Sequence, residues 1–82
     1  MIEIKHRYTG AVICTGVDTL TAVQDAVRNN VSLDGANLEG ANFEGAYLAR
    51  ANFEGANLAR ANLARAYLAR ANFEGANLAR AN

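Results

Sequence analysis

The seventeen letters AYLARANFEGANLARAN, residues 46–62, occur a second time without change at residues 66–82, twenty positions later. The same stretch divides into blocks of five, and the division extends over ten blocks, from VSLDG at 31–35 to ANLAR at 76–80. The first position of a block is Ala in nine of the ten, and the third is Leu or Phe in all ten. A period of five residues within a period of twenty is therefore the pattern that the fold must accommodate.

Neither regular element accommodates this period. An apolar position that recurs every five residues advances by about 140° around an α-helix, so no apolar stripe forms. In a strand, five is an odd number, so the apolar side chains would change face from block to block. A backbone that turns after every block removes the conflict, because four blocks then close one coil and residue n lies over residue n+20.

The third-position side chains are expected to point into the coil and to form its core. These are Leu33, Leu38, Phe43, Leu48, Phe53, Leu58, Leu63, Leu68, Phe73 and Leu78. Alanine at the first position suits a smaller inward site, and coils ~4.8 Å apart would pair their backbones as parallel strands do. Asparagine at the second position predicts either a ladder of amides between coils or a local bond that stabilises each turn.

The blocks of residues 31–82 resemble the pentapeptide-repeat family, whose pattern is A-[ND]-[LF]-x-x. The resemblance implies an all-β solenoid, a right-handed quadrilateral β-helix with the Leu, Phe and Ala positions inside. Residues 31–82 would make about 2.6 coils of twenty residues. Val31 and Ser32 depart from the pattern, as do Tyr47 and Tyr67 at the second position, where a small polar residue is expected.

Residues 1–30 lack the repeat and are expected to form an N-terminal cap, because the terminal units of a solenoid need a lid. Apolar and charged residues alternate at the start, which predicts a half-buried strand containing Ile2, Ile4, His6 and Tyr8. A turn at Thr9-Gly10 and a returning strand over 11–15 complete a hairpin. A short helix follows, capped by Asp18 or Thr19, with apolar Leu20, Val23 and Val27, and ends near Asn29-Asn30.

No such lid follows the last coil, so we expect its edge and its apolar residues to bind a second copy, most simply as a two-fold homodimer. The residues concerned are Leu63, Leu68, Phe73, Leu78, Ala81 and Asn82. The alternatives are a last coil that frays, or a natural cap that this sequence lacks.

The composition limits the classes of function. The 82 residues allow one small domain, and eight basic and eight acidic residues give no net charge, so nothing favours nucleic acid or an anionic membrane. No apolar run approaches a membrane span, and no signal-peptide core is present, which predicts a cytoplasmic protein without a membrane partner. One cysteine, Cys14, excludes an internal disulfide framework.

The sequence offers no catalytic or metal-binding set. His6 is the only histidine and lacks a third ligand beside Cys14, so we expect a packed His6 and a buried, unreactive Cys14. No glycine-rich phosphate loop occurs. The prediction is no enzyme, no cofactor, no metal and no small-molecule substrate.

The outward charges form columns that we interpret as a solvated surface with weak diagonal Glu–Arg pairs. Residues 31–82 carry five acidic and five basic residues. The family resemblance implies an alternative, a DNA mimic that binds gyrase, but such a mimic needs a long acidic face. The exact repeat in the second half exceeds what a fold requires and favours a designed consensus sequence over a recent duplication. The sequence therefore predicts a self-associating structural scaffold, with the gyrase-binding DNA mimic as the alternative.

Overall fold

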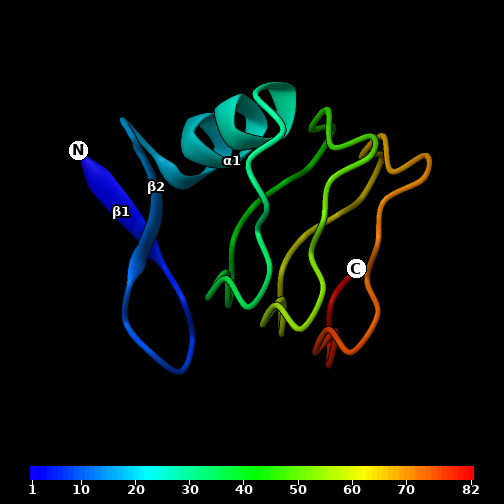
Figure 1. Cartoon of the computed structure of the whole chain (residues 1–82). Coiled ribbons are helices and arrows are strands. Elements are labelled where there is room, and N and C mark those ends of the chain that lie inside the picture. Colours follow the sequence, from blue (N-terminus) through cyan, green and yellow to red (C-terminus); the bar gives the residue numbers. More distant parts are fainter.

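The computed structural model describes all residues from 1 to 82 (Figure 1). It contains two strands and one helix, after which the backbone winds in stacked coils of twenty residues. Strand β1 (Ile2–Lys5) pairs with strand β2 (Val12–Gly16), and helix α1 (Thr19–Arg28) follows. The hairpin lies at one end of the molecule, and the last coil, with the C-terminus, lies at the other (Figure 1). The only helix is far shorter than a membrane crossing requires.

The hairpin is shorter than the alternation of residues predicts. Strands β1 and β2 pair antiparallel, with Ile4 opposite Cys14, and the ladder becomes irregular after Ile4. The His6 ring bends the chain, because its Nδ1 accepts hydrogen bonds from the backbone N–H groups of Tyr8 at 3.2 Å and Thr9 at 3.3 Å. The expectation that Tyr8 lies on a half-buried strand face is therefore wrong, since this side chain is 78% exposed.

Helix α1 begins at the first of the two expected caps. The Asp18 carboxylate accepts a hydrogen bond from the Thr21 N–H at 2.8 Å, and the helix ends with Asn29 as its C-cap. Ala22, Val23 and Ala26 form the buried face of α1 and belong to the same hydrophobic cluster as the first coils. Of the three expected apolar positions only Val23 is fully buried, whereas Leu20 and Val27 are half-buried and pack against the cluster from its margin.

From residue 31 the backbone coils so that residues twenty apart lie side by side. Isolated parallel bridges join them: Asn37 to Asn57, Asn42 to Asn62, Tyr47 to Tyr67, Asn52 to Asn72, and Asn57 to Asn77. Neighbouring coils exchange backbone hydrogen bonds, as where Leu58 N donates to Asn77 O at 2.7 Å and Asn77 N donates to Ala56 O at 2.9 Å.

The repeats contain no regular strand, which corrects the all-β description of the chain. Its only strands are β1 and β2, and α1 is its only helix. In the repeats each bridging residue is followed by a two-residue turn at the fourth and fifth block positions. Coils still bond at the fifth position, as where Arg60 N donates to Ala79 O at 2.8 Å. The fourth-position N–H instead donates to the asparagine side chain of its own block, as from Ala79 N to Asn77 Oδ1 at 3.0 Å, so only single bridges form.

Every block turns through a residue with a positive φ. Within residues 51–56, Ala56 N donates to Phe53 O at 3.0 Å across Gly55, whose φ is 67°. Glycine adopts this left-handed conformation at no steric cost. Five of the turns instead place arginine there: Arg50, Arg60, Arg65, Arg70 and Arg80.

The third-position side chains fill the coil, and their burial decreases toward the C-terminus. Seven of the ten are buried: Leu33, Leu38, Phe43, Leu48, Phe53, Leu58 and Leu63. Leu68 and Phe73 are half-buried and pack against this cluster, whereas Leu78 is 41% exposed. Side chains in one column touch, and the rings of Phe53 and Phe73 stack with centroids 5.3 Å apart.

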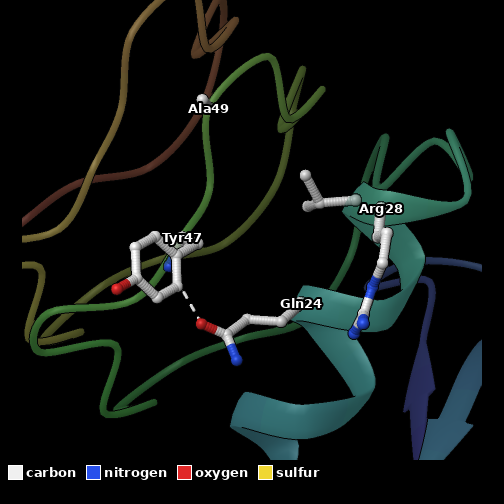
Figure 2. Close-up of a pocket in the computed structure, with 5 residues that line it drawn as sticks. Gln24, Arg28, Tyr47 and Ala49 are labelled. Atoms are coloured by element: carbon white, nitrogen blue, oxygen red, sulfur yellow. Dashed lines mark hydrogen bonds between the residues drawn. The ribbon is translucent and has the colours of Figure 1, made fainter.

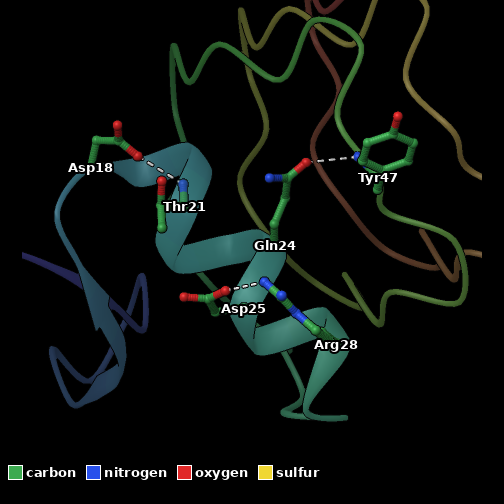
Figure 3. Close-up of polar contacts among 6 residues, drawn as sticks. All are labelled: Asp18, Thr21, Gln24, Asp25, Arg28 and Tyr47. Carbon is green, nitrogen blue, oxygen red and sulfur yellow. Dashed lines mark hydrogen bonds and ion pairs between the residues drawn. The ribbon is translucent and has the colours of Figure 1, made fainter.

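The cap supplies the hydrogen-bond partners that a preceding coil would otherwise provide. Asn37 N donates to Lys5 O and Arg7 N donates to Gly35 O, both at 2.8 Å. Gly35 permits this approach, since a Cβ there would lie 2.2 Å from His6 Nε2. On another face the Gln24 side chain of α1 accepts from Tyr47 N at 2.9 Å (Figure 3).

Candidate functional site

The residues expected to associate with a second copy differ in their exposure. Leu63 is 9% exposed, Leu68, Phe73 and Ala81 are half-buried, and Leu78 and Asn82 are exposed. Leu78 is 41% exposed, whereas Leu58, one coil earlier in the same column, is fully buried. The apolar residues of the last coil are thus covered from one side only.

The backbone of the last coil has an unpaired edge. Leu48 N and Phe53 N donate to carbonyls of the next coil, at 2.9 and 2.8 Å. Their equivalents one coil later, Leu68 N and Phe73 N, have no such acceptor, and Leu78 N also lacks one. Unpaired edge groups of this kind are a template for pairing with another chain.

The second-position asparagines bond mainly to their own turns, and only Asn52 also bonds between coils, where its Nδ2 donates to Ser32 Oγ at 3.1 Å. In seven of the eight, all but the last residue Asn82, Asn Oδ1 accepts from the N–H of the residue two positions later, as where Asn62 accepts from Ala64 at 3.0 Å. The same bond occurs at Asn37, Asn42, Asn52, Asn57, Asn72 and Asn77. Ser32 replaces it with its hydroxyl, which accepts from Asp34 N at 3.2 Å.

Tyr47 and Tyr67 are the two departures that leave this turn bond unmade. A phenol ring cannot reach the N–H groups of Ala49 and Ala69, which receive no side-chain acceptor. A hydrogen bond of this type contributes about 0.5–1.5 kcal/mol. The rings instead stack on each other, with centroids 4.9 Å apart and an interplanar angle of 23°. They are 67% and 57% exposed.

A groove lies between α1 and Tyr47, the first ring of this pair (Figure 2). Its volume is about 480 Å³. Gln24, Val27 and Arg28 line it from the helix, and Tyr47 and Ala49 line it from the coil. A smaller hollow of about 180 Å³ shares Val27 and includes Arg50. Sequence reasoning missed the groove, although the tyrosine departures marked the face on which it opens.

The outward charges partly form the diagonal pairs that the sequence predicts. Arg60 lies 3.7 Å from Glu39, and Arg65 lies 3.5 Å from Glu44, in each case across neighbouring coils. Both pairs are exposed and are worth at most about 1 kcal/mol each. The remaining ion pairs, Lys5 with Glu3 and Arg28 with Asp25, lie in the cap. Members of three columns therefore stay unpaired: Asp34, Glu54 and Glu74; Arg50 and Arg70; and Arg80.

His6 and Cys14 are not brought together with other reactive side chains. The half-buried His6 has its Nδ1 occupied by the turn bonds from Tyr8 and Thr9. Burial raises the pKa of the half-buried Cys14 thiol, which keeps it protonated at neutral pH. No group of three or more His, Cys, Asp or Glu side chains is placed to hold a metal ion.

A coil of five-residue blocks, with stacked Leu/Phe columns and a hydrogen-bonded turn in each block, defines a class of repeat protein. The family model for pentapeptide repeats matches residues 29–63 and 56–82 in eight copies, which is more than half of the chain. The chain therefore belongs to the pentapeptide-repeat family. No curated protein and no solved structure matches it significantly.

Proposed function

We propose that the chain is a non-enzymatic structural scaffold, a right-handed quadrilateral β-helix that binds a second copy through its last coil. The observation that carries this proposal is the unsatisfied edge: Leu68, Phe73 and Leu78 have backbone N–H groups without acceptors. On the same edge the Leu78 side chain is 41% exposed. Association would pair these donors and remove apolar surface from water.

Sedimentation equilibrium of the 82-residue chain over a wide concentration range tests the proposal. We expect the mass to rise from one chain to two as the concentration increases. Leu78→Glu places a charge in the interface and should keep the chain monomeric. Val17→Glu, at an apolar residue 72% exposed on the cap, is the matched control and should leave the dimer intact.

A single-chain mass at every concentration, up to about 1 mM, would contradict the proposal. Equal loss of the dimer in both variants would mean that the interface lies elsewhere, or that the added negative charge keeps the chains apart wherever it is placed. Near-ultraviolet circular dichroism of each variant would confirm that the coil stays folded, since the replaced side chains are exposed.

The gyrase alternative has weaker support. A DNA mimic needs a long face of negative charge, but Asp34, Glu54 and Glu74 form one short column, and arginines occupy the corners of the other faces. The whole molecule measures 28 × 22 × 20 Å, which is less than one turn of DNA, about 34 Å. We expect no effect of the protein in a gyrase supercoiling assay, and protection of the enzyme from an inhibitor would revive the alternative.

A further inference from the structure

On one outer face of the coil, the second-position side chains do not make the hydrogen bond to the turn that they make in the other blocks. We call it the Tyr–Arg face, and it consists of Tyr47, Ala49, Arg50, Tyr67, Ala69 and Arg70. Tyrosine replaces the turn-forming asparagine in both of its blocks, so each block lacks the side-chain bond to its turn. Local violations of a folding rule concentrate at functional sites. Both violations lie on one face and stack on each other.

The polar groups of these tyrosine and arginine side chains have no partner within the chain. Both rings are more than half exposed, and neither hydroxyl makes a hydrogen bond within the chain. Arg50 and Arg70 are the only charged residues of the two blocks, and neither enters an ion pair. Tyrosine and arginine are the residue types that dominate binding hot spots in protein interfaces.

The groove beside α1 extends this face. Tyr67 covers one side of the Tyr47 ring, while the groove residues Gln24, Val27 and Arg28 lie on the helix side (Figure 2). Helix α1 takes the place of a coil before Tyr47, and none of the groove residues that it supplies is aromatic, so no third ring continues the stack. An aromatic side chain that entered the groove, of about 480 Å³, would stack on Tyr47 as the next member of the ladder.

We propose that the Tyr–Arg face binds an acidic segment of a partner protein, with an aromatic side chain of that segment in the groove. The partner's carboxylates would lie against Arg50 and Arg70, which have no acidic partner of their own. A nucleic acid fits less well, because the two tyrosines cover each other and leave few ring faces for bases. The unpaired Asp34, Glu54 and Glu74 on the adjoining face would also repel a long polyanion.

A suitable probe is a heptapeptide with a central tryptophan and glutamate at each of the six remaining positions. The chain contains no tryptophan, so the fluorescence of the peptide alone reports binding. We expect a saturable change in the tryptophan fluorescence at low salt, and weaker binding at an ionic strength of about 0.15 M. The same peptide with glutamine in place of glutamate should bind about tenfold more weakly.

Two double variants locate the site. Tyr47→Asn with Tyr67→Asn installs the residue that other blocks use for their turns, so the coil should fold at least as well while affinity falls about tenfold. Arg50→Gly with Arg70→Gly places glycine at positive-φ positions and should cause a similar loss. The matched control, Arg60→Gly with Arg80→Gly, removes the same charge from another corner and should change affinity less than about twofold.

Several outcomes would overturn the proposal. These are equal weakening by the control pair, equal binding of the glutamate and glutamine peptides, and no binding of the acidic peptide at about 1 mM. Tighter binding of a labelled single-stranded oligothymidylate, lost in the tyrosine variant, would assign the face to nucleic acid instead.

Discussion

The fifth position of the blocks carries local strain wherever it is not glycine. Arg50 has a φ of 69° and Arg60 a φ of 63°, close to the 67° of Gly55. This left-handed conformation is unfavourable by roughly 1–2 kcal/mol for an L-residue with a Cβ. Glycine has no such steric penalty, although it loses more chain entropy on folding. Burial of the neighbouring Leu/Phe columns is what holds the arginines there.

Arg50 is the cleanest place to measure this strain, because it makes no ion pair. Arg50→Gly should raise the free energy of unfolding by about 0.5–1 kcal/mol. Arg50→Val should lower it by about 1–3 kcal/mol, because a β-branched side chain tolerates a positive φ least. Urea unfolding of the three proteins measures both changes, and equal stability of the Gly and Val variants would contradict the account.

The start of helix α1 depends on its N-cap residue. Its N-terminus is fixed by Asp18, and the hydrogen bond from Thr21 lowers the pKa of the Asp18 carboxyl below its ordinary value of 3.8 (Figure 3). The folded chain therefore holds this proton less tightly than the unfolded chain does. Between the two pKa values stability rises with pH, and the contribution is complete above about 3.8.

Asp18→Asn isolates this contribution, because an amide oxygen still accepts the cap hydrogen bond but does not titrate. As the pH falls from about 5 to about 2, the unfolding midpoint of the unaltered protein should decrease more steeply than that of the variant. Thermal unfolding followed by circular dichroism at each pH gives the two curves. Parallel curves would show that the cap carboxylate is not linked to folding.

Over the whole molecule, stability follows the decreasing cover of the columns from the cap to the last coil. Leu58 and Leu78 share one column and one neighbourhood of Ala and Asn residues, but Leu58 is fully buried and Leu78 is 41% exposed. The helix covers one end of the stack, and in a single chain nothing covers the other.

Leu58→Ala should therefore cost about 2–5 kcal/mol, because the cavity it leaves is enclosed by coils on both sides. Leu78→Ala should cost less than about 1 kcal/mol in the monomer. Urea unfolding at a concentration where single chains predominate measures both values. Similar losses at the two positions would contradict the burial gradient.

The period of five predicted the columns and the relation between residues n and n+20, because both follow from where a repeated side chain must go. It did not predict the bend at His6, which depends on a ring nitrogen accepting two backbone N–H groups. Nor did it predict Gln24 as the acceptor for Tyr47 N, or the groove beside them, because both depend on how closely α1 approaches the coil. Self-association and designed origin stay predictions.

Amide hydrogen exchange of the single chain, resolved by NMR, tests most directly that coils pair across twenty residues and that one edge is left open. We expect slow exchange at Leu48, Phe53 and Leu58, whose N–H groups donate to the next coil. One coil later, Leu68, Phe73 and Leu78 should exchange at least about 100-fold faster. Equal protection of the two sets in the monomer would contradict the account.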